Sequence, residues 1–144
     1  MRKYNVVNDL NPNGKWITEE EWKNVARATV EECQNMATPS QVGCTALWTG
    51  GVIRKAVFAQ TLGTDAIQIA FPFWLPLNEI QSLNFLKEVS SAVPEMPITL
   101  YNTSRSKMTL TEDLLKKILA SYIPLVGCKG VRSKEELDRF SRIA

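Results

Sequence analysis

Apolar and polar positions along the chain follow two patterns that alternate. Short runs that are apolar on both sides are followed each time by a longer stretch with apolar residues at helical spacing. The short runs are "SQVGCTALW", "DAIQIAFP", "MPITLYN" and "PLVGCKGV". The unit repeats about every 25 to 35 residues, which is typical of a strand followed by a helix. We therefore predict four βα units in a domain over residues 18–144, preceded by an irregular segment at 1–17.

Five helices are predicted from this spacing. The first begins after Thr18, which with Glu21 forms a capping box, and Ser133 with Glu136 repeats the motif before the last. The helical stretches are "TEEEWKNVARATVEEC", "TGGVIRKAVFAQTLG", "NEIQSLNFLKEVSSAV", "TEDLLKKILASY" and "SKEELDRFSRIA". The expected apolar faces are Trp22, Val25, Ala26, Thr29 and Val30 in the first helix, and Ile80, Leu83, Phe85, Leu86 and Val89 in the third.

Strands that are apolar on both faces and alternate with amphipathic helices predict an α/β protein with a parallel sheet covered by helices. Two architectures fit: an open doubly wound sheet or part of a barrel. No GxGxxG or GxxxxGK[ST] fingerprint is present, which disfavours the open nucleotide-binding sheet. In both architectures ligands gather at the carboxyl ends of the strands. That edge contains Trp48, Thr49, Pro72 to Trp74, Tyr101 to Arg105, and Lys129.

Composition narrows the chemistry. A chain of 144 residues with a net charge of +2 and no basic run allows one domain and argues against a nucleic-acid partner. No stretch approaches the roughly 20 apolar residues of a membrane span, and the N-terminus lacks a signal-peptide core, so we expect no membrane partner and a cytoplasmic location. The three cysteines form no CxxC pair, and histidine is absent. Neither a metal site nor a histidine-assisted nucleophile is expected.

Lys129, between Gly127 and Gly130 in "LVGCKGV", is the leading candidate for catalysis. In a crowded apolar pocket its amine would lose a proton more easily and could attack a carbonyl to form a Schiff base. The alternative is a strand-end lysine that reaches solvent. Tyr101, which ends the preceding strand, could relay protons, or it could simply pack its ring.

Four further residues at this edge are candidates for substrate binding. Arg105 would suit a carboxylate, although loop arginines often face water. Trp74 could wall a pocket or belong to the core. Asn102 and Thr49 end or follow their strands on the same side.

Taken together, "LGTDAIQIAFPFWLP", "MPITLYNTSRS" and "PLVGCKGV" resemble the dihydrodipicolinate synthase/N-acetylneuraminate lyase family of class I aldolases. The resemblance implies a (β/α)₈ barrel in which Lys129 forms a Schiff base with pyruvate or a related 2-oxo acid, with no cofactor. It also implies Tyr101 as the proton shuttle, Arg105 near the second substrate's carboxylate, and a homo-oligomer. The function expected is therefore that of a Schiff-base lyase or aldolase.

Departures from the family pattern refine this expectation. "NPNGKWIT" stands where the family has a G-T-T-G-E motif that holds the 2-oxo acid's carboxylate, and Phe73-Trp74 replaces paired tyrosines. An aromatic hydratase-aldolase or a sugar-acid aldolase fits at least as well as an enzyme of lysine biosynthesis. The four strands resemble strands three to six of a barrel that needs about 200 to 250 residues. We therefore expect a truncated gene product, or a partial barrel that completes itself with another chain. The alternative functions are a catalytically incomplete or regulatory fragment, and an unrelated open α/β binding module.

Overall fold

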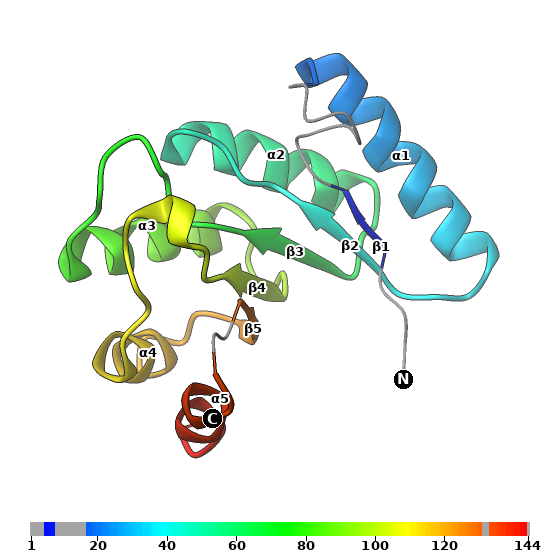
Figure 1. Cartoon of the computed structure of the whole chain (residues 1–144). Coiled ribbons are helices and arrows are strands. Elements are labelled where there is room, and N and C mark those ends of the chain that lie inside the picture. Colours follow the sequence, from blue (N-terminus) through cyan, green and yellow to red (C-terminus); the bar gives the residue numbers. More distant parts are fainter. Residues whose placement is uncertain (1–4, 8–16, 131–132, 144) are drawn as a thin grey trace.

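A computed structural model of the chain describes residues 5–7, 17–130 and 133–143, and shows strands and helices that alternate along the sequence (Figure 1). The strands are β1 (Asn5–Val7), β2 (Ser40–Gly43), β3 (Ala66–Ile69), β4 (Ile98–Tyr101) and β5 (Leu125–Lys129). The helices are α1 (Glu19–Asn35), α2 (Thr49–Thr61), α3 (Glu79–Ala92), α4 (Glu112–Leu119) and α5 (Lys134–Ser141), with a short 3₁₀ turn, η1, at Ser104–Ser106.

The five strands form one parallel sheet in the order β1-β2-β3-β4-β5. Each strand lies beside the one before it, so every crossover runs in the same direction. Right-handed crossovers of constant direction place all the helices on one face of the sheet, and Figure 1 shows them in a row around its outer side. A doubly wound sheet would reverse its order at a switch point. The sheet is therefore a segment of a (β/α) barrel, as the resemblance implied, and the open-sheet alternatives are wrong.

The sheet holds one more strand than the four that the sequence predicted. β1 pairs in parallel with β2, with Asn5, Val6 and Val7 opposite Ser40, Gln41 and Val42. It lies within the segment 1–17 that was expected to be irregular. If the four predicted strands take the places of strands three to six of a barrel, β1 takes the place of strand two.

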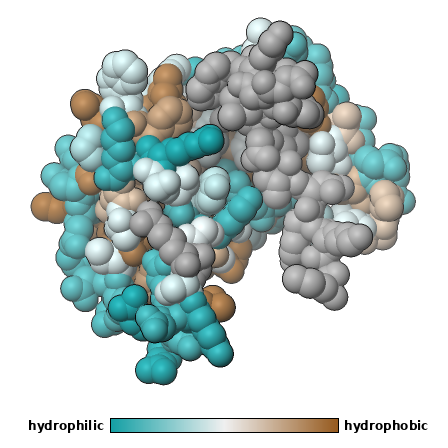
Figure 2. Space-filling model, viewed as in Figure 1, coloured by the Kyte–Doolittle hydropathy of each residue, from teal (hydrophilic) through white to brown (hydrophobic). Residues whose placement is uncertain are grey.

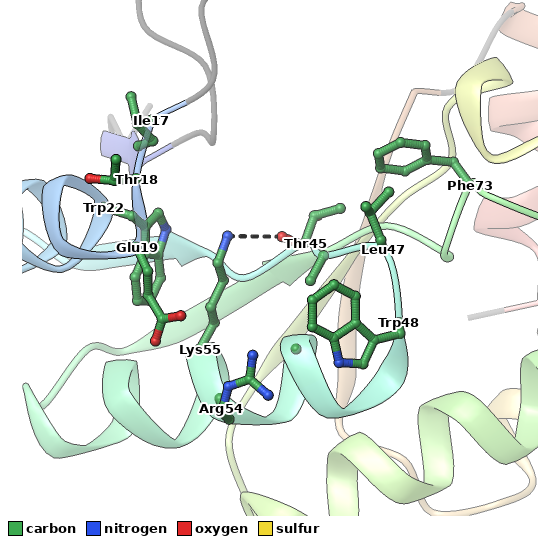
Figure 3. Close-up of a pocket in the computed structure, with 12 residues that line it drawn as sticks. Ile17, Thr18, Glu19, Trp22, Thr45, Leu47, Trp48, Arg54, Lys55 and Phe73 are labelled. Carbon is green, nitrogen blue, oxygen red and sulfur yellow. Dashed lines mark hydrogen bonds between the residues drawn. The ribbon is translucent and has the colours of Figure 1, made fainter.

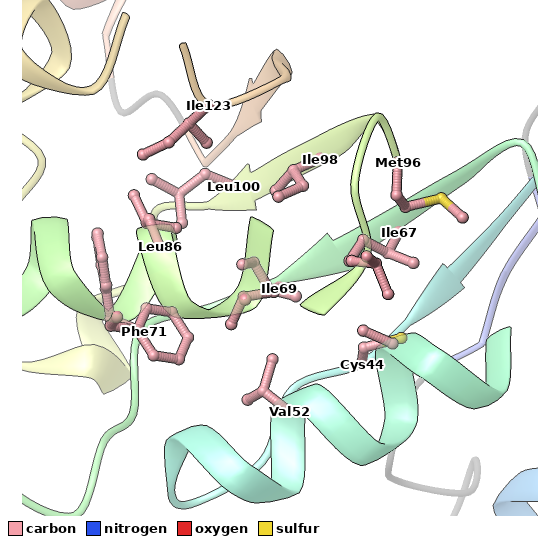
Figure 4. Packing of buried hydrophobic residues seen from close by; sticks show 14 of the residues in the cluster. Cys44, Val52, Ile67, Ile69, Phe71, Leu86, Met96, Ile98, Leu100 and Ile123 are labelled. Carbon is pink, nitrogen blue, oxygen red and sulfur yellow. The ribbon is translucent and has the colours of Figure 1, made fainter. Parts of the chain in front are cut away.

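The apolar core lies between the sheet and the helices. Ile67, Ile69, Ile98 and Leu100 are fully buried on the helix-facing side of β3 and β4, and Figure 4 shows Ile69 near Leu86 of α3 and Val52 of α2. The outer surface over α5 is mostly hydrophilic (Figure 2). This division between an apolar inner stripe and a polar outer surface is the reason why the predicted helical periods were recovered.

Helix ends agree closely with the sequence motifs, whereas two apolar positions do not. The capping boxes of Thr18 with Glu21 and of Asn78 with Gln81 are complete, and Ser133 accepts a hydrogen bond from the Glu136 amide. The predicted apolar faces, however, included residues that are exposed. Ile80 is 72% exposed and Val25 is 47% exposed. The buried stripes of their helices consist of other residues, namely Ser82, Phe85, Leu86 and Val89 in α3 and Trp22, Ala26, Val30 and Cys33 in α1.

Candidate functional site

Tyr101 and Lys129 end neighbouring strands and lie side by side. The two residues are register partners in the β4–β5 ladder, and the Lys129 Nζ lies 4.9 Å from the centroid of the Tyr101 ring. Register partners in parallel strands point to the same face of the sheet, here the concave face that carries no helix. Both residues thus lie at the carboxyl edge of the sheet, where the sequence analysis placed each of them. Tyr101 is half-buried, and Lys129 is exposed rather than enclosed in a crowded pocket.

The backbone just beyond this pair ties the two strands together. The Asn102 amide donates a hydrogen bond of 2.7 Å to the Lys129 carbonyl. Gly130 follows with a φ of +92°, and a Cβ atom at that position would lie 2.2 Å from the Asn102 carbonyl oxygen. A glycine is therefore required for the strands to approach so closely. This contact fixes the position of Lys129 along its strand relative to Tyr101.

The Asn102 side chain is buried beneath this tie. Its Oδ1 accepts a hydrogen bond of 3.3 Å from the Leu110 amide, which anchors the loop that leads to α4. Its Nδ2 is buried and has no hydrogen-bond partner within the described part of the chain. Of the predicted substrate-binding residues, Asn102 is thus the one placed closest to the lysine along the sheet.

A polar row continues along the concave face toward the amino ends of the strands. The Gln41 Nε2 donates to the Gln68 Oε1 at 3.3 Å, and the Thr99 hydroxyl donates to the Gln41 Oε1 at 3.3 Å. Gly127 is the register partner of Thr99, and it leaves the space beside this row unfilled. The face that would line a barrel interior therefore presents hydrogen-bonding groups below Tyr101.

Cys128 points to the opposite face from Lys129, because adjacent residues of a strand alternate. Its register partner is the fully buried Leu100. Burial raises the pKa of the Cys128 thiol above its ordinary value, and a hydrogen bond from the Asn102 backbone offsets part of that increase. The thiol next to the candidate nucleophile is thus held in its protonated, less reactive form.

Arg105 and Trp74 come together at a second place on the same edge. They line an open hollow with Phe73, Leu75 and Lys107, where the loop after β3 meets the loop after β4. The Ser106 hydroxyl donates a buried hydrogen bond of 3.1 Å to the Phe71 carbonyl and joins these two loops. Sequence analysis placed Trp74 and Arg105 at this edge but missed Lys107.

Thr49 is the first residue of α2, beside a separate pocket of about 200 Å³ that it does not line. In Figure 3 the Lys55 side chain extends from α2 into this pocket. Its Nζ donates a hydrogen bond of 3.1 Å to the Thr45 carbonyl and lies 5.0 Å from the centroid of the Trp22 ring. Arg54 lies over the Trp48 ring at 5.6 Å. The sequence analysis missed this pocket, and the signal that could have indicated it is the adjacent Arg54-Lys55 pair in α2, the helix whose N-cap residue is Trp48.

Residues 5–7, 17–130 and 133–143 contain no group of three or more potential metal ligands. Among the same residues, no helix has both the length and the apolar character to cross a bilayer. The "NPNGKWIT" segment that stands in place of the family's carboxylate motif lies mostly outside the described residues, which resume at Ile17.

Several known sequences are similar to this chain. No protein-family model matches the chain. A DapA-like lyase of uncharacterised function from Thermococcus onnurineus is 33% identical over 88 residues, which are 61% of this chain and 30% of that protein. The 4-hydroxy-tetrahydrodipicolinate synthase of Sulfurimonas denitrificans is 26% identical over 108 residues, or 74% of this chain and 36% of the synthase. The chain thus spans about a third of the length of these relatives.

Solved structures give the same picture for the fold. One of them is YagE, a prophage protein of the dihydrodipicolinic acid synthase family from E. coli K12, which was solved in complex with pyruvate. It superposes with a TM-score of 0.83 at 18% identity, and the match covers 97% of this chain and 58% of YagE. PhdJ, solved bound to a substrate intermediate, gives a TM-score of 0.79 at 23% identity over 88% of this chain and 40% of its own. At these identities the likeness shows the fold alone. Sequence and fold together point to the dihydrodipicolinate synthase (DapA-like) family, and the chain corresponds to part of its barrel.

Proposed function

We propose that the chain carries the reactive centre of a Schiff-base lyase or aldolase acting on pyruvate or a related 2-oxo acid. The observation that supports it is the placement of Lys129 beside Tyr101, with the Nζ 4.9 Å from the phenol ring, at the carboxyl edge of a barrel segment. An amine next to a phenol can combine nucleophilic attack with proton transfer. The fold likeness to lyases of this family supports the same assignment.

In the proposed reaction the neutral Lys129 amine attacks the keto carbon of the 2-oxo acid. The carbinolamine that forms loses one water molecule and becomes a protonated imine. This imine withdraws electrons from the neighbouring carbon, so that a C–C or C–O bond at that position can form or break. The Tyr101 hydroxyl would pass the protons that these steps release and consume. No metal or organic cofactor is required, because the imine itself is the electron sink.

The exposure of Lys129 favours a specific alternative, a partial barrel that keeps the fold but does not turn over. An enclosed site excludes water from the reacting groups and prevents the hydrolysis of a reactive intermediate such as an imine. The described residues leave Lys129 exposed. Under this alternative the amine would need cover from further protein, such as a second copy in a homo-oligomer, before an imine accumulates.

Trapping of the imine distinguishes the two functions. The purified chain is incubated with pyruvate and cyanoborohydride, which reduces an imine to a stable secondary amine, and the intact mass is read. We expect a pyruvate-sized adduct that is absent in Lys129→Ala and unchanged in Lys116→Ala, which removes an exposed lysine of α4. Tyr101→Phe keeps the ring and removes the hydroxyl, and it should slow adduct formation by about 10²-fold or more.

Two results would contradict this proposal. A folded wild-type chain, verified by circular dichroism, that gives no adduct at any pyruvate concentration supports the catalytically incomplete fragment. An adduct that persists in Lys129→Ala assigns the reactive amine to another lysine.

A further inference from the structure

Three polar side chains on the concave face form a row to which the sequence analysis assigned no role. Gln68 on β3 is the register partner of Thr99 on β4, and Thr99 is in turn the partner of Gly127 on β5. Gln41 joins this row from β2, because its amide bonds to both Gln68 and Thr99. The interior of a (β/α) barrel is usually packed with bulky branched apolar side chains, so a polar row here needs a physical reason.

The row lies directly below the reactive pair. Thr99 precedes Tyr101 by two residues on β4, and Gly127 precedes Lys129 by two residues on β5, so these side chains share one face of the sheet. A strand rise of about 3.3 Å per residue puts the row about 6–7 Å below the pair. Among the described residues, a Cβ atom at Gly127 would meet the Thr99 side chain alone, at 3.6 and 3.8 Å. The interval between the row and the pair is therefore open on the β5 side.

The hydrogen bonds within the row leave several N–H groups unused. The Thr99 hydroxyl donates to the Gln41 Oε1, and one hydrogen of the Gln41 Nε2 goes to the Gln68 Oε1. A primary amide carries two N–H donors. In the part of the chain that the structure describes, the second Gln41 hydrogen and both hydrogens of the Gln68 Nε2 form no hydrogen bond. Gln68 is only 3% exposed, and a buried amide with unused donors points to a ligand that supplies the acceptors.

These unused groups define the chemistry of the ligand. The oxygens of a carboxylate accept hydrogen bonds and donate none, so they match a row that offers N–H donors. An ammonium ligand would bring further donors and no acceptor. The charge also fits, because Lys129 is an ammonium before the reaction and a protonated imine carries its positive charge on the same nitrogen. A carboxylate held below Lys129 is therefore attracted at both stages.

We infer that the row of Gln41, Gln68 and Thr99 is the floor of the substrate site and holds the carboxylate of the 2-oxo acid. The inference rests on the proposed function, since the imine at Lys129 would place that carboxylate above the row. The amide N–H groups of Gln68 and Gln41 would bind the two carboxylate oxygens. Thr99 would be a positioning residue, because its hydroxyl orients the Gln41 amide. The row would thus select 2-oxo acids over uncharged ketones and esters.

A comparison of pyruvate with methyl pyruvate tests this selection. Both compounds have the same keto group, and the ester lacks the charge. The rate of adduct formation with cyanoborohydride is measured for each compound, and the ratio of the two rates is compared with the ratio for Nα-acetyl-lysine. We expect the wild-type chain to favour pyruvate by about tenfold or more relative to this free amine, because a charge-assisted contact is worth roughly that factor. The ratio is taken within one protein, so a change in the folded fraction does not alter it.

Variants of the row define the result. Gln68→Leu removes the amide at similar size, and it should lower the pyruvate preference about tenfold while the adduct with methyl pyruvate persists. Gln68→Glu adds a like charge and should lower the preference further, whereas Thr99→Val should have a smaller effect in the same direction. Gln60→Leu and Gln60→Glu alter an exposed glutamine of α2 and are the matched controls. A preference that is unchanged in both Gln68 variants would overturn the inference.

A ligand that forms no imine separates the two proposals. Oxamate has the shape and charge of pyruvate, but its carbonyl belongs to an amide. In the ¹⁵N-labelled chain, oxamate should shift the side-chain amide signals of Gln41 and Gln68 along a saturable curve, and Gln68→Leu should abolish saturation. Such binding without a pyruvate adduct would refute the Schiff-base function and keep the carboxylate site. An adduct at Lys129 that shows no preference for pyruvate would refute the carboxylate site and keep the Schiff-base function.

Discussion

Replacement of Gly130 by alanine perturbs the tie that positions the candidate nucleophile. The new Cβ would lie 2.2 Å from the Asn102 carbonyl oxygen, and the φ of +92° is itself unfavourable for a residue with a Cβ. An alanine at this φ costs about 1–2 kcal/mol. Displacement of Asn102 also weakens the hydrogen bond from its amide to the Lys129 carbonyl, which is worth about 1 kcal/mol. We expect Gly130→Ala to lower the free energy of unfolding by about 2–3 kcal/mol.

Gly127→Ala is the matched control for this substitution. It adds the same methyl group two residues after β5 begins, where the nearest atom is the Thr99 Oγ1 at 3.6 Å, an ordinary contact distance. Its stability should stay within about 1 kcal/mol of the wild type. Any larger loss at Gly127 would indicate a general intolerance of β5 to side chains.

Urea unfolding followed by circular dichroism measures both effects. The transition of Gly130→Ala should move to lower urea, while that of Gly127→Ala stays near the wild type. An unchanged midpoint for Gly130→Ala would refute the claimed close approach of the two strands. The pyruvate adduct of Gly130→Ala, measured under folded conditions, should also fall, because the strand shift moves Lys129 relative to Tyr101.

Three further predictions follow from single contacts. Trp22→Phe removes the indole N–H that donates a buried hydrogen bond of 3.0 Å to the Gly43 carbonyl. The loss of this hydrogen bond should lower the free energy of unfolding, measured in urea, by about 1–3 kcal/mol. Thr18→Ala removes the cap of α1 and should cost about 1 kcal/mol by the same assay. For Cys128, the raised pKa means that less thiolate exists at any pH near 8, so iodoacetamide should modify it more slowly in the folded chain than in urea, with the rate reaching its plateau at higher pH. Equal folded and unfolded rates would contradict the burial of this thiol.

The order of elements could be predicted because each strand and helix carries its own local signal. Apolar runs bounded by glycine and proline identified β2 to β5, and the caps at Thr18 and Asn78 act within four residues of the chain. β1 was missed because its three residues give no period to detect, and pairing with β2 defines it. The exposure of Ile80 was missed because its spacing from Leu83 is helical, whereas the buried stripe of α3 consists of Ser82, Phe85, Leu86 and Val89.

Part of the candidate site could be predicted from the sequence, and part depends on tertiary packing. Tyr101 and Lys129 could be paired in advance because the carboxyl ends of neighbouring parallel strands meet at one edge. The Lys55–Trp22 pocket could not, because it joins α1 and α2 through side chains that are 33 residues apart in the sequence. The sequence left open whether Lys129 lies in a pocket or reaches solvent, because its exposure depends on everything that could cover the concave face.

The character of that concave face bears on whether a partial barrel can hold together. In a closed barrel this face lines the interior, which a partial barrel leaves without the remaining strands. In the described residues the apolar layer instead lies between sheet and helices, while the concave face carries the hydrogen-bonded row of Gln41, Gln68 and Thr99. The side chains of this row hydrogen-bond to one another, with Gln68 buried and Gln41 and Thr99 half-buried, so each of them has a hydrogen-bond partner within the row. The apolar core that stabilises the fold thus lies on the opposite face of the sheet from the Lys129 amine that would form an imine. Loss of the chemistry at Lys129 need not accompany loss of the fold, which is why a folded chain without an imine is a meaningful result.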